Sequence, residues 1–161
     1  MSTGKILVSD KDGSYLIKFS GDVRVNLCGS LNHHMDAIFG SSGVQRVVID
    51  MLDAECVDST TLGLIAKLAL HCRKEYSINV QLFCQNPSIL RTLSCMSFDE
   101  IIDIHEEVPD IEADLHAIES VNSDIDEVRR QVLEAHKLLT QLSPDSSKEF
   151  TDLIRALESG N

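Results

Sequence analysis

The chain has 161 residues, 43% of them hydrophobic, and a formal net charge of −12 at pH 7. This length predicts one domain with room for an appendage, and the negative charge argues against a nucleic-acid partner because phosphate binding needs a basic face. No apolar run is long enough for a transmembrane helix, and the first residues lack the apolar core of a signal peptide. We therefore expect a cytoplasmic protein without a membrane partner.

The predicted elements before the motif are a strand over 5–8, a strand over 14–20, a helix over 30–39 and a strand over 44–51. Asp12-Gly13 is a hairpin dipeptide, so the first two strands should pair antiparallel. Ser30 is a candidate helix cap. The run Val47-Val48-Ile49 lacks alternation, as expected for a strand covered on both faces.

The elements that follow are a helix from 62 to about 76, a strand over 78–84, a helix from 87 to about 96 and a strand over 100–105. Asn86-Pro87 has the cap-then-proline signature of a helix start. The order predicts an α/β fold with a mixed, largely parallel sheet and packing helices. The acidic loop 52–58 should then lie at the carboxyl ends of the strands, where such sheets meet ligands and partners.

The composition changes after Glu107, which predicts a domain over 1–107 and a C-terminal helical extension over 108–161. Residues 111–142 contain no Gly or Pro and carry apolar residues at steps of three and four, which predicts a long helix. A second helix should begin near Ser146, which has capping-box spacing to Glu149. This helical hairpin could cap the core in cis, dimerise the chain or dock a second partner, so a monomer or a weak dimer is expected.

Five cysteines without a Cys-x-x-Cys pair, most of them in apolar segments, predict reduced and mostly buried thiols. His33-His34 lacks partners at metal-ligand spacing, so no metal or cofactor is expected. No nucleophile-elbow or Walker-type motif occurs, and we expect no catalytic residues and no enzyme activity.

The junction Asp58-Ser59-Thr60-Thr61-Leu62-Gly63-Leu64 places hydroxyl groups where a helix begins and its amides are still unpaired. It resembles the Asp-Ser-(Ser/Thr)-Gly-Leu-Gly signature of STAS-domain anti-sigma factor antagonists. Gly21-Asp22-Val23 and Val47-Val48-Ile49-Asp50 are similar to two further segments of that family. The resemblance extends from residue 5 to about 106. Thr61 replaces the usual Gly, and Arg24 stands where many members have Asp.

The resemblance implies that Ser59 accepts a phosphoryl group and that the unphosphorylated protein sequesters an anti-sigma factor, which it releases or exchanges after phosphorylation. The implied partner-binding residues are Asp58, Thr60, Thr61, Leu62, Gly63, Asp22 and Arg24. It also implies a serine kinase and a metal-dependent PPM-type phosphatase acting on Ser59, either separate or joined in one response regulator.

The segment Gly21–Arg24 and the helical tail look more like a proteobacterial subgroup linked to phosphorelays that control biofilm, motility or stationary-phase sigma factors. The anti-sigma factor would then be a flagellar or stationary-phase one. Two alternatives stay open. In one, the protein is a constitutive adaptor that assembles a complex through its tail, with Ser59 only a helix cap. In the other, it is a small-molecule-binding STAS module.

Overall fold

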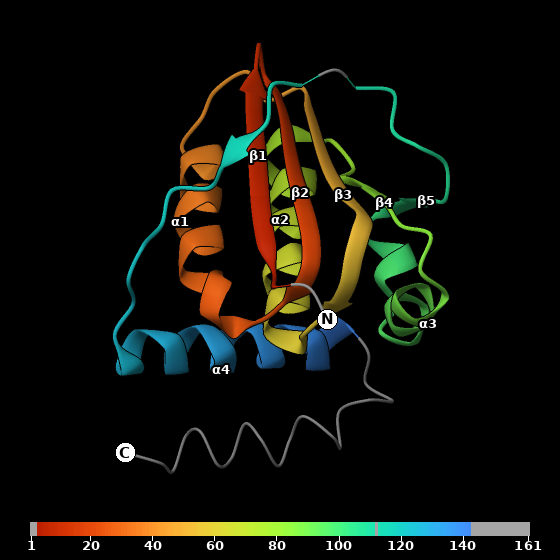
Figure 1. Cartoon of the computed structure of the whole chain (residues 1–161). Coiled ribbons are helices and arrows are strands. Elements are labelled where there is room, and N and C mark those ends of the chain that lie inside the picture. Colours follow the sequence, from red (N-terminus) through yellow and green to blue (C-terminus); the bar gives the residue numbers. More distant parts are fainter. Residues whose placement is uncertain (1–2, 112, 143–161) are drawn as a thin grey trace.

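The computed structural model describes residues 3–111 and 113–142, which form a mixed α/β fold (Figure 1). The strands are β1 (Lys5–Lys11), β2 (Ser14–Val23), β3 (Arg46–Val57), β4 (Gln81–Phe83), β5 (Asp103–His105) and β6 (His116–Ala117). The helices are α1 (Cys28–Phe39), α2 (Ser59–Tyr76), α3 (Pro87–Cys95) and α4 (Ile125–Leu142), with 3-10 turns η1 (Val25–Leu27) and η2 (Phe98–Glu100).

The six strands form one sheet in the order β5-β4-β3-β2-β1-β6. β2, β3, β4 and β5 run parallel to one another, whereas β1 is antiparallel to both β2 and β6. This confirms the predicted fold class of a mixed, largely parallel sheet with packing helices.

The β1–β2 hairpin turns at the predicted dipeptide. Asp12 and Gly13 both have positive φ, 52° and 84°, and Lys11 pairs with Ser14 across the turn. A two-residue turn with positive φ at both positions matches the right-handed twist of its strands. The predicted start of α3 is also confirmed, because the Asn86 side chain accepts from the Ser88 amide and Pro87 is the first helical residue.

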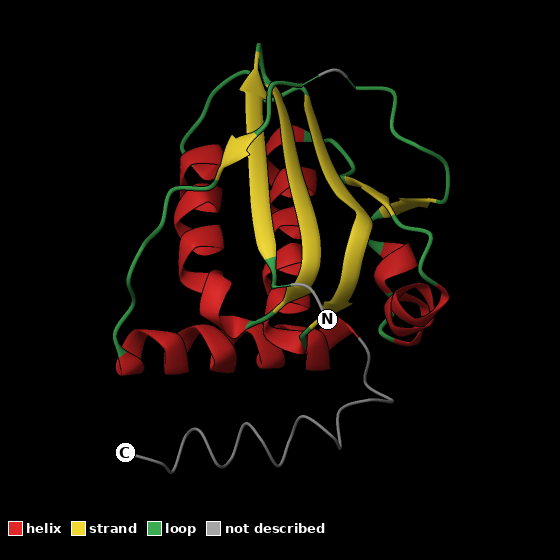
Figure 2. Cartoon of the chain, viewed as in Figure 1, coloured by secondary structure: helices red, strands yellow, loops and turns green. Residues whose placement is uncertain are grey.

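Both faces of the sheet are covered. α1 and α2 pack on one face (Figure 2), over a core that includes Phe19, Ile49 and Ile65. On the other face, a small cluster around Leu16 and Val48 is covered by Ile111, Ala113 and Leu52. The unbroken apolar run at Val47–Ile49 is therefore buried from both sides, as its lack of alternation predicted.

The prediction of an acidic loop over 52–58 was wrong, since β3 continues to Val57. Its second half pairs in parallel with the end of β2, with irregularities in register near Ser20 and Asp22. The sequence does not reveal this extension of β3, because one face of it is exposed to solvent and carries polar residues. A single residue, Asp58, therefore separates the end of β3 from the start of α2.

The prediction of one helix over 111–142 was wrong for its first half. β6 pairs with the edge of β1, and the Ile118 amide donates to the Ile6 carbonyl at 3.1 Å. The free edge of β1 offers backbone partners, which here outweigh the helical periodicity of the segment. The second predicted helix, from Ser146 onwards, lies outside the described residues.

Ser30 is not a helix cap either, because α1 begins at Cys28. Its hydroxyl accepts from the Val121 amide at 3.0 Å and so ties the segment before α4 to α1. α4 then lies across the N-terminal ends of α1 and α2 (Figure 1) and buries Gln131, Ala135, His136 and Leu139. The tail thus packs in cis, one of the three roles considered for it.

Candidate functional site at the start of α2

Asp58 is the N-cap of α2. Its backbone is extended, with φ −81° and ψ 169°, and its Oδ1 accepts from the Thr61 amide at 2.9 Å and from the Thr61 hydroxyl at 2.8 Å. These contacts satisfy one of the unpaired donors of the helix start. The interpretation of Ser59 as the helix cap is therefore wrong. Ser59 is the first helical residue, and its hydroxyl plays no part in the cap.

The Ser59 hydroxyl instead contacts a residue far away in the sequence. Ser59 Oγ lies 2.7 Å from His136 Nε2 on α4, and His136 Nδ1 lies 2.7 Å from the Val132 carbonyl oxygen. A carbonyl can only accept, so Nδ1 carries the proton in the neutral ring and Nε2 is left as an acceptor. In this tautomer the Ser59 hydroxyl therefore donates a hydrogen bond to His136 Nε2.

The next residues of the motif turn inward. Thr60, Thr61 and Leu62 are buried, with Thr61 fully so. Thr61 Oγ1 also lies 3.5 Å from the Cys28 thiol, and burial raises the pKa of that thiol to about 11. The Thr that replaces the usual Gly thus finds partners for its hydroxyl inside the domain. These three residues anchor the start of α2 in the interior of the domain, while Ser59 is only half-buried.

Gly63 lies where α2 and α4 approach most closely. A Cβ at this position would lie 2.6 Å from the Cα of Ala135 and 2.8 Å from its carbonyl oxygen. Real Cβ atoms do not approach a backbone this closely, so the side chain has to be absent. The glycine of the motif therefore allows α4 to sit directly on α2.

Asp22 and Arg24 lie beside the motif, as the resemblance implied for the neighbouring segment. Val23 pairs with Val57, and the Asp58 amide donates to the Val23 carbonyl at 3.2 Å. Arg24 Nε donates to Asp22 Oδ2 at 2.7 Å, and this hydrogen bond raises the pKa of the guanidinium. Arg24 is exposed, so its charge is available at the surface next to the start of α2.

Sequence reasoning missed His136, although it contacts Ser59. The apolar periodicity around Ala135 and Leu139 marks an inward face of α4, and His136 adjoins that face. No spacing rule links a histidine to a serine 77 positions earlier. Among the described residues, no group of three or more His, Cys, Asp or Glu side chains is arranged to hold a metal ion.

A sheet with α1 and α2 on one face, in which strand β3 leads into a helix that is capped by Asp58 and begins with Ser59-Thr60, defines a small STAS-type domain. The STAS domain family matches residues 5–111, and the chain belongs to this family. No curated protein matches the chain. STAS domains are typical of anti-sigma factor antagonists and are generally binding modules without catalytic activity. None of the helices within 3–111 and 113–142 has the length and apolar character needed to cross a membrane.

Proposed function

We propose that this chain is an anti-sigma factor antagonist whose choice of partner is switched by phosphorylation of Ser59. The unmodified protein sequesters an anti-sigma factor, and the phosphorylated protein releases it or changes partner. A serine kinase and a PPM-type phosphatase, separate or joined in one response regulator, set the balance in the cytoplasm. The subgroup resemblance favours a flagellar or stationary-phase anti-sigma factor, in the control of biofilm or motility.

The observation that carries this proposal is the position of Ser59 as the first residue of α2. Asp58 makes the cap, so modification of the Ser59 hydroxyl leaves the cap contacts to Thr61 intact. A phosphate at this place meets unpaired amides and the positive end of the helix dipole, an interaction worth about 0.3–1 kcal/mol. The domain should therefore stay folded when phosphorylated.

The same phosphate would strongly change the surface that a partner meets. It adds about −1.5 to −2 charges next to the carboxylate of Asp58, the N-cap residue immediately before Ser59. Burying that charge in an interface without a matching cation costs several kcal/mol, and each ~1.4 kcal/mol changes affinity tenfold. One phosphate is thus enough to exchange partners without reshaping the fold.

The motif residues divide into two roles in this proposal. Ser59, Gly63, Asp58 and the Asp22–Arg24 pair lie at the start of α2 or beside it and contact the partner. Thr60, Thr61 and Leu62 support that surface from within, since they are buried. We assign this module to residues 1–107 and the C-terminal extension to 108–161.

The test is capture of partners from the native cytosol with Ser59→Ala and Ser59→Asp proteins as baits, and wild-type protein phosphorylated at Ser59 as a third. Ser88 supplies the matched control, because it is an exposed serine in the first turn of α3. We expect the Ser59 baits to retain different proteins and the Ser88→Ala and Ser88→Asp baits to retain the same set. Identical sets from all three Ser59 baits would refute the switch and favour a constitutive adaptor.

A further inference from the structure

One face of α2 carries both the proposed phosphorylation site and the contacts to α4. Ser59, Gly63 and Lys67 are spaced four residues apart and so lie on the same face of the helix. The three contacts are Ser59 with His136, Gly63 with Ala135, and Lys67 with Glu134. α4 therefore covers the face of α2 on which Ser59 lies, along its first two turns.

The centre of this contact is closely packed. Ala135 is 2% exposed and Leu139 is fully buried, and the backbones meet at Gly63. At the rim, Lys67 Nζ lies 3.1 Å from Glu134 Oε1, but the pair is partly exposed and should contribute little to docking. Docking of α4 thus depends on the small side chains at its centre.

α4 packs against the half-buried Ser59 side chain. The His136 ring, itself 3% exposed, accepts a hydrogen bond from the Ser59 hydroxyl at 2.7 Å, so it occupies one side of Oγ. A kinase has to bring a phosphoryl donor to Oγ, and a partner that reads Ser59 and Gly63 has to contact the face that α4 covers. Both events require α4 to leave.

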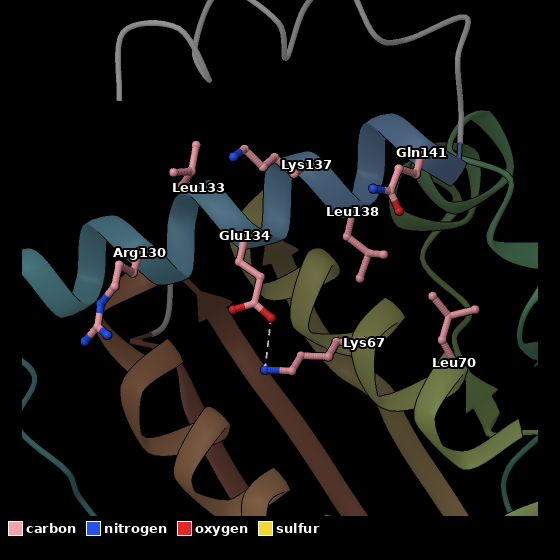
Figure 3. A pocket seen from close by; sticks show the side chains of 8 residues that line it. All are labelled: Lys67, Leu70, Arg130, Leu133, Glu134, Lys137, Leu138 and Gln141. Atoms are coloured by element: carbon pink, nitrogen blue, oxygen red, sulfur yellow. Dashed lines mark ion pairs between the residues drawn. The ribbon is translucent and has the colours of Figure 1, made fainter. Parts of the chain in front are cut away.

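The interface also has features that limit its strength. Gln131 is 7% exposed, and among the described residues its Oε1 has no hydrogen-bond partner. A buried polar group without a partner costs about 1–3 kcal/mol. On one side of the contact, an open groove of about 570 Å³ separates the two helices (Figure 3). It is lined by Lys67, Leu70, Arg130, Leu133, Glu134, Lys137, Leu138 and Gln141.

We propose that α4 is an autoinhibitory helix, which occupies in cis the surface of α2 that the kinase and the anti-sigma factor need. This inference rests on the proposed function of Ser59. In the closed state α4 covers Ser59 and Gly63, and in the open state it has left α2. Only the open state is phosphorylated or binds the partner, so the apparent affinity falls in proportion to the open fraction.

The decisive variant is Ala135→Leu, because a larger side chain at this position collides with the Gly63 backbone while the α2 surface stays unchanged. Leu and Ala are both good helix formers, so the change should act on docking. Asp126→Leu is the matched control, since it adds apolar atoms at an exposed position of the same helix that lies outside the groove between α2 and α4. Gln131→Leu should have the opposite effect and favour the closed state, because it removes the buried amide oxygen that has no hydrogen-bond partner among the described residues.

Hydrogen exchange of the full chain measures docking without any partner. A released helix of 18 residues is only marginally stable, so α4 amides should lose protection in Ala135→Leu and keep it in Asp126→Leu. Access to the site is measured as the rate of Ser59 phosphorylation in native cytosol supplied with ATP. We expect this rate to rise about tenfold or more in Ala135→Leu, in proportion to the open fraction. It should be unchanged in Asp126→Leu and should fall in Gln131→Leu.

The autoinhibitory role is overturned if Ala135→Leu loses protection of α4 while Ser59 is phosphorylated at the wild-type rate. If Ser59 is phosphorylated in none of the chains and the Ser59 baits also retain the same proteins, the proposed function fails, and this inference fails with it. If Ala135→Leu also loses protection of the sheet, the test rests on Gln131→Leu. Stronger protection of α4 together with slower Ser59 phosphorylation in Gln131→Leu supports the inference, and any other result in this variant rejects it.

Discussion

Gly63 and Ala135 face each other so closely that the α2–α4 interface has no room for a Cβ at position 63. Ala135 is 2% exposed, so its methyl group is part of the packed centre. Two small residues, one on each helix, therefore set how near α4 comes to the start of α2.

Gly63→Ala should detach α4 while it strengthens α2. Replacing a mid-helix glycine with alanine favours the helix by about 0.5–1 kcal/mol, but the new methyl group collides with the Ala135 backbone. We expect α4 amides to exchange rapidly while the β1–β3 amides stay protected. Gly40→Ala is the control, because the nearest atom to its Cβ lies 3.6 Å away. Unchanged protection of α4 in Gly63→Ala would show that the interface can adjust.

Asp58→Ala should destabilise the domain by about 1 kcal/mol, the usual cost of removing an N-cap side chain. The Thr61 amide and hydroxyl both lose their acceptor, and Thr61 is fully buried, so water cannot easily replace it. Asp58→Asn keeps an oxygen at the same place and should recover most of the loss. The measurement is the midpoint of urea unfolding, and equal midpoints for Asp58→Ala and wild type would contradict the assignment of the cap.

The five thiols should react with iodoacetamide in two groups at pH 8. Burial disfavours the thiolate and raises the pKa of Cys28 and of Cys72 to about 11, and it also raises the pKa of Cys84. With a pKa of about 11, roughly one thiol in a thousand is ionised at pH 8.

Cys56 and Cys95 are exposed and should be alkylated first. Mass spectrometry of the peptides over time gives the order, and urea supplies the control because unfolding should make all five sites react. Raising the pH towards 11 should speed alkylation of Cys28 and Cys72. Alkylation of Cys28 as fast as Cys56 in the folded protein would mean that α1 opens readily.

The parts of the fold that were predicted from sequence are those fixed by neighbouring residues. The Asp12-Gly13 turn, the Asn86-Pro87 helix start and the buried strand around Val48 each depend on local conformational preference or burial, and the structure confirms them. Three of the five cysteines, Cys28, Cys72 and Cys84, are buried, as predicted.

The missed features depend on contacts between distant segments. The apolar spacing of Ile118 and Val121 suits a helix, but both lie in the extended segment that runs along β1 and α1. The continuation of β3 depends on its pairing with β2, which its polar composition does not reveal. The bond between Ser59 and His136 depends on where α4 lies, and α4 can be placed only once β6 is paired with β1.

The pairing of β6 with β1 also determines what happens to α4 after it leaves α2. The chain is held at Ala117 by β1 and at Val121 by the Ser30 hydroxyl, so only a few residues separate these anchors from the start of α4 at Ile125. A short tether of this kind gives an effective local concentration on the order of millimolar, whatever the dilution of the protein. An outside partner therefore competes with a helix of fixed local concentration, so its apparent affinity is lowered by the same factor at every dilution of the protein.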